Sequence, residues 1–149
     1  MRLVIQRVLE SSVRIDGKVV GQIGRGYMVL CGVEDGDTQD DLRYCIDKTV
    51  NLRIFEDDAG KMNRSLVDIG GSVLAISQFT LLGDARHGRR PSFSHAARPE
   101  LAEPLCDMVR DLLIAQGVPV LTGRFRTHMK VDLLNDGPVT ILLDSKRNF

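Results

Sequence analysis

The sequence predicts a single mixed α/β domain whose two helices cover one face of a sheet system. Three observations support this prediction. Strand-like segments occupy both ends of the chain, two amphipathic helical segments lie between them, and a long loop without periodicity separates the helices. A length of 149 residues gives room for one sizeable core, so we expect one domain spanning residues 1–149.

The first quarter of the chain predicts a small antiparallel meander. Residues 2–8 alternate with strand period, and the segments 12–15 and 18–23 flank Asp16-Gly17, which is a strong hairpin signal. The continuous apolar run Tyr27–Cys31 then favours a strand that is buried on both faces.

The first helix is predicted to begin after Thr38, which forms a capping-box pattern with Asp41. Its apolar face consists of Leu42, Cys45, Ile46, Thr49 and Val50. A second buried strand follows at Val73–Ile76 and becomes polar at Ser77-Gln78. We expect the chemistry of the protein to begin at that polar end.

Residues 83–98 are rich in Arg, Gly, Ser and Pro, and a loop of this length within one domain is typically functional or disordered. A second helix is predicted from about Pro99 to Gln116, although Pro104 suggests a later start or an irregular first turn. Its apolar face is predicted to be Leu101, Leu105, Met108, Val109 and Leu112. Strands are expected at 118–121, 131–134 and 139–144, and the turn formers Asn135–Pro138 join the last two.

The composition excludes several classes of protein. Twenty basic side chains balance twenty acidic ones, which excludes a histone-like protein and at first sight argues against a nucleic-acid partner. No apolar run is long enough for a membrane span, and no secretory leader is recognisable, so a membrane partner is not expected. The three cysteines lie far apart in apolar stretches, which favours buried free thiols and a cytoplasmic location.

A metal site and a local catalytic triad are both poorly supported. The chain has no Cys-x-x-Cys pair, and His87, His95 and His128 lack helical ligand spacing, so we expect neither metal nor cofactor. Ser77 lies outside any Gly-x-Ser-x-Gly motif. A triad assembled in space from one of the histidines remains open.

The charge is balanced overall but segregated locally. Basic residues concentrate at Arg86, Arg89, Arg90 and Arg98, and again at Arg124, Arg126 and Lys130. Such segregation produces an electropositive face that can hold a polyanion at zero net charge. The alternative interpretation is that these are ordinary solvated side chains.

Three segments strongly resemble the D-aminoacyl-tRNA deacylases. They are Ser77-Gln78-Phe79-Thr80-Leu81, Gly88-Arg89-Arg90-Pro91-Ser92-Phe93 and Asn135-Asp136-Gly137-Pro138-Val139-Thr140. Shorter matches at residues 5–8, 53–55, 61–63 and 122–125 occur in the same order as in that family, so the resemblance spans almost the whole chain. It implies layered mixed sheets, β-rich and barrel-like, with the two principal helices on one face.

The resemblance implies a homodimeric editing hydrolase, active without a metal, with its active sites at the subunit interface. It would cleave the ester of D-aminoacyl-tRNA, or of mischarged glycyl-tRNA. Its substrate-binding residues would be Ser77, Gln78, Phe79, Met129, Gly137 and Pro138, and Arg89 and Arg90 would bind tRNA. Its chiral filter would be a cis Gly137-Pro138 step, held in place by Arg7 and inserted into the pocket of the partner subunit.

Two mechanisms are compatible with the resemblance. In one, the ribose 2′-OH of the tRNA assists hydrolysis, and main-chain N–H groups at Phe79 and Thr80 stabilise the oxyanion. In the other, Thr80 is the nucleophile of an esterase. A non-catalytic RNA-binding module is the alternative from a different class. The chain departs from the family at Arg126-Thr127-His128, where small residues are usual, so Arg126 and His128 either contact tRNA or face solvent.

Overall fold

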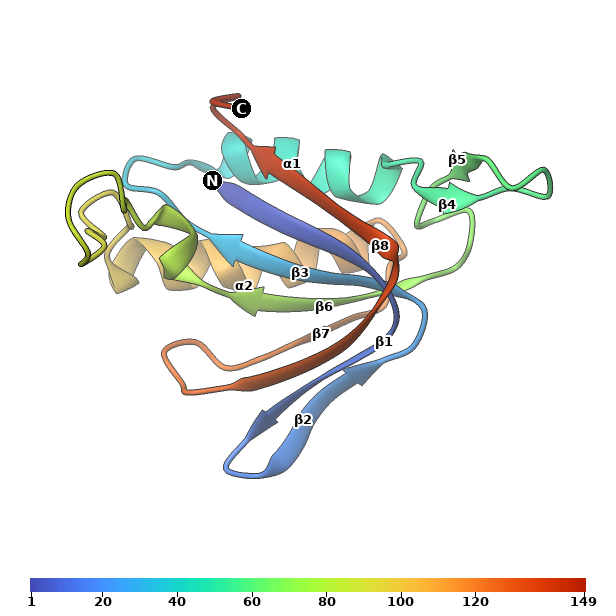
Figure 1. Ribbon diagram of the computed structural model, residues 1–149, viewed down its shortest axis with the longest axis horizontal. Helices are drawn as coiled ribbons and strands as arrows, with labels where there is room; N and C mark the ends of the chain where they lie inside the picture. The colour runs from blue at the N-terminus through green and yellow to red at the C-terminus, as the bar shows by residue number, and fades with distance from the viewer.

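The computed structural model describes residues 1–149 and contains a six-stranded mixed sheet (Figure 1). The strand order is β2-β1-β3-β6-β7, and β8 pairs with the free side of β1. The strands are β1 (Arg2–Ile15), β2 (Lys18–Ile23), β3 (Gly26–Gly32), β6 (Ser72–Ser77), β7 (Val120–Thr122) and β8 (Lys130–Asp144). A separate small sheet pairs β4 (Phe55–Glu56) with β5 (Met62–Arg64).

The two long strands give the sheet its barrel-like form. β1 and β8 run antiparallel over most of their length, with register irregularities between Gln6 and Glu10 of β1. Extra residues in one strand of a pair bend it and increase its twist. Figure 1 shows both strands bending, so that their two halves form two walls of a partly closed barrel. The predicted layered, β-rich architecture is therefore confirmed.

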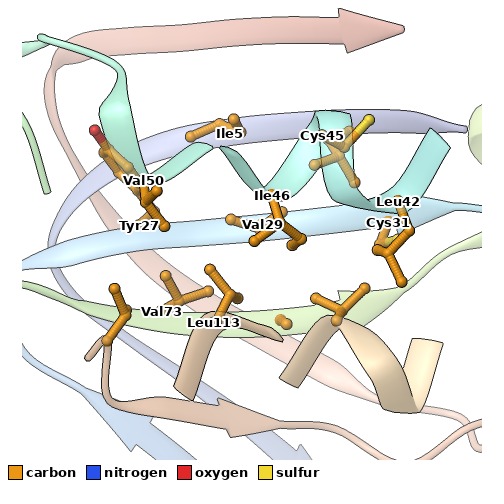
Figure 2. Packing of buried hydrophobic residues seen from close by; sticks show 14 of the residues in the cluster. Ile5, Tyr27, Val29, Cys31, Leu42, Cys45, Ile46, Val50, Val73 and Leu113 are labelled. Atoms are coloured by element: carbon orange, nitrogen blue, oxygen red, sulfur yellow. The ribbon is translucent and has the colours of Figure 1, made fainter. Parts of the chain in front are cut away.

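The main core lies between the sheet and the two helices. These are α1 (Gln39–Asn51) and α2 (Pro99–Ala115), and both contribute to one cluster of 22 buried residues. Figure 2 shows Leu42, Cys45, Ile46 and Val50 of α1 together with Leu113 of α2 and with Tyr27 and Val29 of β3. Both helices thus cover the same face, as the sequence predicts. The opposite face is filled by the smaller cluster of Val8, Val13, Ile23, Met28, Leu74 and Ile76.

The structure confirms the start of α1 and its buried face. The Thr38 N–H donates to Asp41 Oδ2 at 2.9 Å, which satisfies one of the amide groups that a helix leaves unpaired at its beginning. The buried residues of α1 are Leu42, Cys45, Ile46, Thr49 and Val50. The helix α2 begins at Pro99, a position at which a missing N–H is tolerated, and it continues through Pro104.

Two predictions about individual elements are wrong. The first quarter is not a meander, because β3 pairs with β1 and not with β2. Asn135–Pro138 is not a hairpin turn, because β8 continues past it and pairs with β1 on both sides. The predicted apolar face of α2, by contrast, does face the core. Leu105 and Val109 are buried, and Leu101, Met108 and Leu112 pack against the same core while partly buried. The prediction missed only the buried Ala102 and Leu113.

The chain contains no helix that combines the length and apolar character needed to cross a membrane.

Candidate active site

The largest cavity of the molecule opens beyond the carboxyl ends of β3 and β6. These two strands are parallel, and their last paired residues are Cys31 and Ser77. Ligands of parallel sheets characteristically bind beyond this end. The cavity measures about 660 Å³. Its walls are formed by Cys31, Val33, Ser77, Gln78, Phe79, Phe93, Ala96, Ala97, Pro99, Ala102, Cys106 and residues 125–129.

The predicted motif begins at this end of β6. Ser77, Gln78 and Phe79 all line the cavity, as predicted from the polar end of the strand. The Gln78 N–H donates to the Cys31 carbonyl at 2.7 Å, which fixes the motif to the end of β3. The following short helix, Phe79–Leu82, begins with the amides of Phe79 and Thr80, neither of which donates to a carbonyl or a side chain. These amides are available to a ligand.

The Thr80 side chain lies outside the cavity wall. Thr80 is exposed, and its hydroxyl oxygen accepts a hydrogen bond from Gln78 Nε2 at 2.9 Å. No histidine or carboxylate contacts that hydroxyl. A nucleophilic hydroxyl needs a base within hydrogen-bond reach, and this one has only an amide.

Two aromatic rings stand at the mouth of the cavity. Phe79 and Phe93 meet edge to face, with ring centroids 5.1 Å apart, and Phe79 is 58% exposed. A side chain at Gly83 would press against the Phe93 ring, because its Cβ would lie 3.0 Å from that ring. Exposed aromatic faces of this kind stack on unpaired nucleobases.

The segment after β7 forms the opposite wall. Met129 packs its sulfur directly over the bare Cα of Gly123, where any Cβ would collide with it. Arg126 and His128 are exposed residues that also line the cavity. The residues at which the chain departs from the expected small pattern therefore lie at the cavity itself, and not on a remote solvent-facing surface.

The loop that leads to Phe93 carries basic side chains without carboxylate partners. Arg86 is compensated by Asp84, which accepts two hydrogen bonds from its guanidinium at 2.9 and 2.6 Å, and this contact holds the pKa of Asp84 well below its usual range. Arg89 and Arg90 are exposed and form no ion pair. Their charge remains available to a polyanion.

The Gly137-Pro138 step lies far from this cavity. Its peptide bond is cis, and both residues are exposed. The step lies opposite Arg7 in the bulged part of the β1–β8 pair. Arg7 pairs with Tyr27, Tyr27 pairs with Val73, and Ser77 lies four residues beyond Val73 on β6. Since β8 and β6 are three inter-strand steps apart, the Gly137-Pro138 step lies roughly 20 Å from Ser77. The structure therefore does not place the step in the cavity of its own chain.

Arg7 and Asn135 hold the backbone around this step. Arg7 is only 4% exposed, and its guanidinium donates to the carbonyls of Asp136 at 2.8 Å and Ile54 at 2.6 Å. The Asn135 side chain accepts from the Val139 N–H at 2.8 Å and donates to the Val139 carbonyl at 3.1 Å. The role of Asn135 was not predicted, although Asn hydrogen-bonds nearby backbone readily and could have indicated a clamp.

Sequence reasoning also missed the wall contributed by the end of the long loop and the start of α2. Ala96, Ala97, Ala102 and Cys106 line the cavity. The loop is attached there by the hydrogen bonds from Asp35 N–H to the His95 carbonyl and from Ala97 N–H to the Val33 carbonyl, both 2.9 Å. The run of small residues around position 97 was the available signal, because small side chains leave room for a ligand.

Comparison with known proteins identifies relatives over the whole chain. The family model described as D-Tyr-tRNA(Tyr) deacylase matches residues 4–144. Proteins named D-aminoacyl-tRNA deacylase from Natranaerobius thermophilus and Clostridioides difficile are 59% and 56% identical, and each alignment covers 100% of both chains. A solved structure titled c-Myc DNA Unwinding Element Binding Protein matches with a TM-score of 0.91 at 39% identity, covering 97% of this chain and 98% of that one.

A second solved structure supports the fold alone. It is titled as a probable eukaryotic D-amino acid tRNA deacylase and matches with a TM-score of 0.76 at 20% identity, covering 95% of this chain and 97% of that chain.

Proposed function

The chain belongs to the D-Tyr-tRNA(Tyr) deacylase family, and we propose that it hydrolyses the ester joining a D-amino acid, or glycine, to the terminal adenosine of tRNA. It is an enzyme of the D-aminoacyl-tRNA deacylase type, a carboxylic ester hydrolase. The observation that carries the proposal is the cavity at Ser77–Phe79, which combines free main-chain N–H groups with exposed aromatic rings and adjoins a loop that carries the unpaired Arg89 and Arg90.

The cavity suits the end of an aminoacyl-tRNA. Phe79 and Phe93 offer a surface for the terminal adenine, and Arg89 and Arg90 offer positive charge to the phosphates before it. Ser77, Gln78 and Met129 line the space into which the aminoacyl group would extend. The volume of about 660 Å³ falls within the range of small-molecule sites.

The mechanism we propose relies on main-chain groups and on the substrate itself. The N–H groups of Phe79 and Thr80 stabilise the oxyanion that forms when water attacks the ester carbonyl. The neighbouring ribose 2′-OH orients or activates that water. The Thr80 hydroxyl has no basic partner, which argues against its serving as the nucleophile.

The chiral selection we propose uses the Gly137-Pro138 step of a second subunit. An apolar pocket distinguishes substrates that differ by one methylene by only about 1–3 kcal/mol, whereas L-aminoacyl-tRNA is in great excess in the cell. Rigid carbonyl oxygens placed where an L side chain must lie reject it by steric clash. Glycine has no side chain to reject. The step is exposed and remote from its own cavity, which favours a homodimer with sites at the interface.

The proposal is tested by incubating the protein with matched D- and L-aminoacyl-tRNA. Selective loss of the D ester is the expected result. Binding without hydrolysis would instead indicate an RNA-binding module, and hydrolysis of both enantiomers would indicate an ordinary esterase.

A second comparison separates the two mechanisms. The Thr80→Ala variant is expected to retain substantial deacylation, and a substrate ending in 2′-deoxyadenosine is expected to lose it. Rapid hydrolysis of the deoxy substrate by the unmodified protein would exclude assistance by the 2′-OH.

A further inference from the structure

Two of the three cysteines line the same wall of the active-site cavity. Cys31 lies near the end of β3 and is 3% exposed, whereas Cys106 lies in α2 and is partly exposed. Both line the main cavity, and both also line a smaller cavity next to it. Neither is part of a disulfide. Cys45, on α1, is fully buried and lines neither cavity.

The two thiols differ in acidity because they interact. A hydrogen bond from the Cys31 thiol lowers the pKa of Cys106, against the opposing effects of burial and of the nearby carboxylates Asp107 and Glu103. The same contact, together with complete burial, raises the pKa of Cys31 well above its usual value. Cys106 is therefore the more acidic of the two thiols, and it lines the cavity. A partly exposed thiol of lowered pKa next to a second thiol is the arrangement found in redox-responsive cysteine pairs.

We propose that Cys31 and Cys106 form a redox-active dithiol that closes to a disulfide across the cavity wall when it reacts with a small disulfide such as oxidised glutathione. The Cys106 thiolate attacks one sulfur of the small disulfide and releases one thiolate. Cys31 then loses its proton to solvent, attacks Cys106 Sγ in the mixed disulfide and expels the second thiolate. Both protein thiols are oxidised, and the small disulfide is reduced to two thiols.

Closing this bond changes the cavity. A disulfide holds its sulfurs about 2 Å apart, which is closer than two thiols in hydrogen-bond contact, so the bond draws α2 toward β3. Ala102 lies one helical turn from Cys106, and Ser77 pairs with Cys31, so both walls of the site move with the bond. Misplacement of a site by about 1 Å can cost about 100-fold in rate. The effect on activity rests on the proposed function, whereas formation of the bond does not.

The test equilibrates the protein in glutathione buffers of graded oxidised-to-reduced ratio and then traps free thiols by alkylation. Intact mass and peptide mapping are expected to show the loss of two hydrogens and a Cys31–Cys106 link. The same samples are assayed with D-aminoacyl-tRNA. Their kcat/KM is expected to fall about tenfold or more on oxidation, and dithiothreitol is expected to restore it.

Three variants complete the test, each compared with its own reduced form after a thermal melt confirms folding. Cys45→Ala is expected to respond as the unmodified protein does, Cys106→Ser is expected not to respond, and Cys31→Ser is expected to stop at a glutathione adduct on Cys106. A link through Cys45, a Cys106 that stays free, or a bond that leaves kcat/KM unchanged would each overturn the proposal. Failure of the proposed function would be seen separately, as an inactive reduced protein whose thiols can still be mapped.

Discussion

Arg7 shows how one buried charge serves two parts of the structure. Its guanidinium joins the carbonyl of Ile54, which follows α1, to the carbonyl of Asp136, which precedes the Gly137-Pro138 step. It also lies 3.4 Å from the Asp136 carboxylate. The contact with the Ile54 carbonyl is buried, so this carbonyl has no ready access to water as an alternative partner, whereas the contact with Asp136 is only partly buried.

Replacing Arg7 with Met is expected to lower the free energy of unfolding by about 2–3 kcal/mol, because it leaves the buried Ile54 carbonyl unpaired and removes the hydrogen bond to the partly buried Asp136 carbonyl. Urea denaturation followed by circular dichroism measures this change. Under the proposed chiral filter, the variant is also expected to hydrolyse L-aminoacyl-tRNA faster, relative to D-aminoacyl-tRNA, than the unmodified protein does.

The matched control is Arg14→Met, on the same strand. Arg14 is exposed and forms an ion pair only with the exposed Asp132, and such pairs contribute about 0–1 kcal/mol. Equal losses of stability in the two variants would show that the Arg7 contacts do not carry the stated energy.

At the scale of the element, α1 depends on its first turn. Burial tends to raise the pKa of Asp41, but hydrogen bonds from Ser145, Thr38 and Lys146 outweigh it and hold this pKa well below its usual range. The ion pair with Lys146, at 3.1 Å, also connects the start of α1 to the segment after β8. A carboxylate with a lowered pKa stabilises the fold above its unfolded pKa of about 3.9, and this contribution is lost as the pH falls below that value.

Asp41→Asn is therefore expected to cost about 1 kcal/mol of stability at neutral pH, as the loss of a helix cap does. The difference from the unmodified protein is expected to shrink progressively as the pH falls below about 4 toward the lowered pKa of the folded state, because Asp41 is then protonated in the unfolded chain and its carboxylate no longer favours folding as strongly. Urea denaturation at a series of pH values measures both effects. Asp40→Asn is the control, since Asp40 is 90% exposed and contacts only Arg43. A constant difference at all pH values would refute the assignment.

The loop of residues 83–98 supplies charge without forming regular secondary structure. Arg89→Ala and Arg90→Ala are each expected to weaken tRNA binding and to reduce the slope of log affinity against log salt by about 0.7–1. The change is expected in KM and not in kcat, because these side chains lie outside the cavity wall. Filter binding at several salt concentrations measures the slope.

Arg64→Ala controls for loss of a single positive charge. Arg64 lies in β5, which Figure 1 shows at the opposite end of the molecule from this loop. If all three variants changed the slope equally, the loop would not be the tRNA contact.

At the scale of the whole molecule, the sequence predicts the elements better than their connections. The apolar face of α1 was predicted residue by residue, because its 3.6-residue period is a local property. The pairing of β3 with β1, and the passage of β8 through Asn135–Pro138, depend on contacts between segments that are far apart in the chain. The turn formers at 135–138 produce a bulge here, because Arg7 and Asn135 bind the backbone on both sides.

The sequence likewise predicted only part of the candidate site. The Ser77–Phe79 segment was found from the polar end of a buried strand and from family resemblance, and it lines the cavity. The wall formed by Ala96, Ala102 and Cys106 was missed, because a run of small residues in a sequence indicates room for a ligand but not which cavity the residues line. Only the packing of α2 against β3 and the end of the loop reveals that they face a cavity.

The separation of the Gly137-Pro138 step from the cavity leads to a test of the assembly. If the Gly137-Pro138 step of each subunit enters the cavity of its partner, one subunit with a damaged step and one with a blocked cavity together still form one complete site. Gly137→Ala damages the step, because its φ of +146° disfavours a side chain and the added Cβ would lie 2.6 Å from Val139 Cγ2. Ala96→Trp places a large ring in the cavity wall.

The heterodimer of these two variants, purified through two different tags, has one open cavity, which belongs to the Gly137→Ala subunit. With the step supplied by the partner, that cavity receives the intact step of the Ala96→Trp subunit and is expected to hydrolyse D- but not L-aminoacyl-tRNA. The Gly137→Ala homodimer is expected to lose this selectivity. If instead each chain supplies the step to its own cavity, the open cavity of the heterodimer receives the damaged step, and the heterodimer is as unselective as the Gly137→Ala homodimer. The ratio of D to L hydrolysis in the two assemblies therefore decides which subunit supplies the chiral filter.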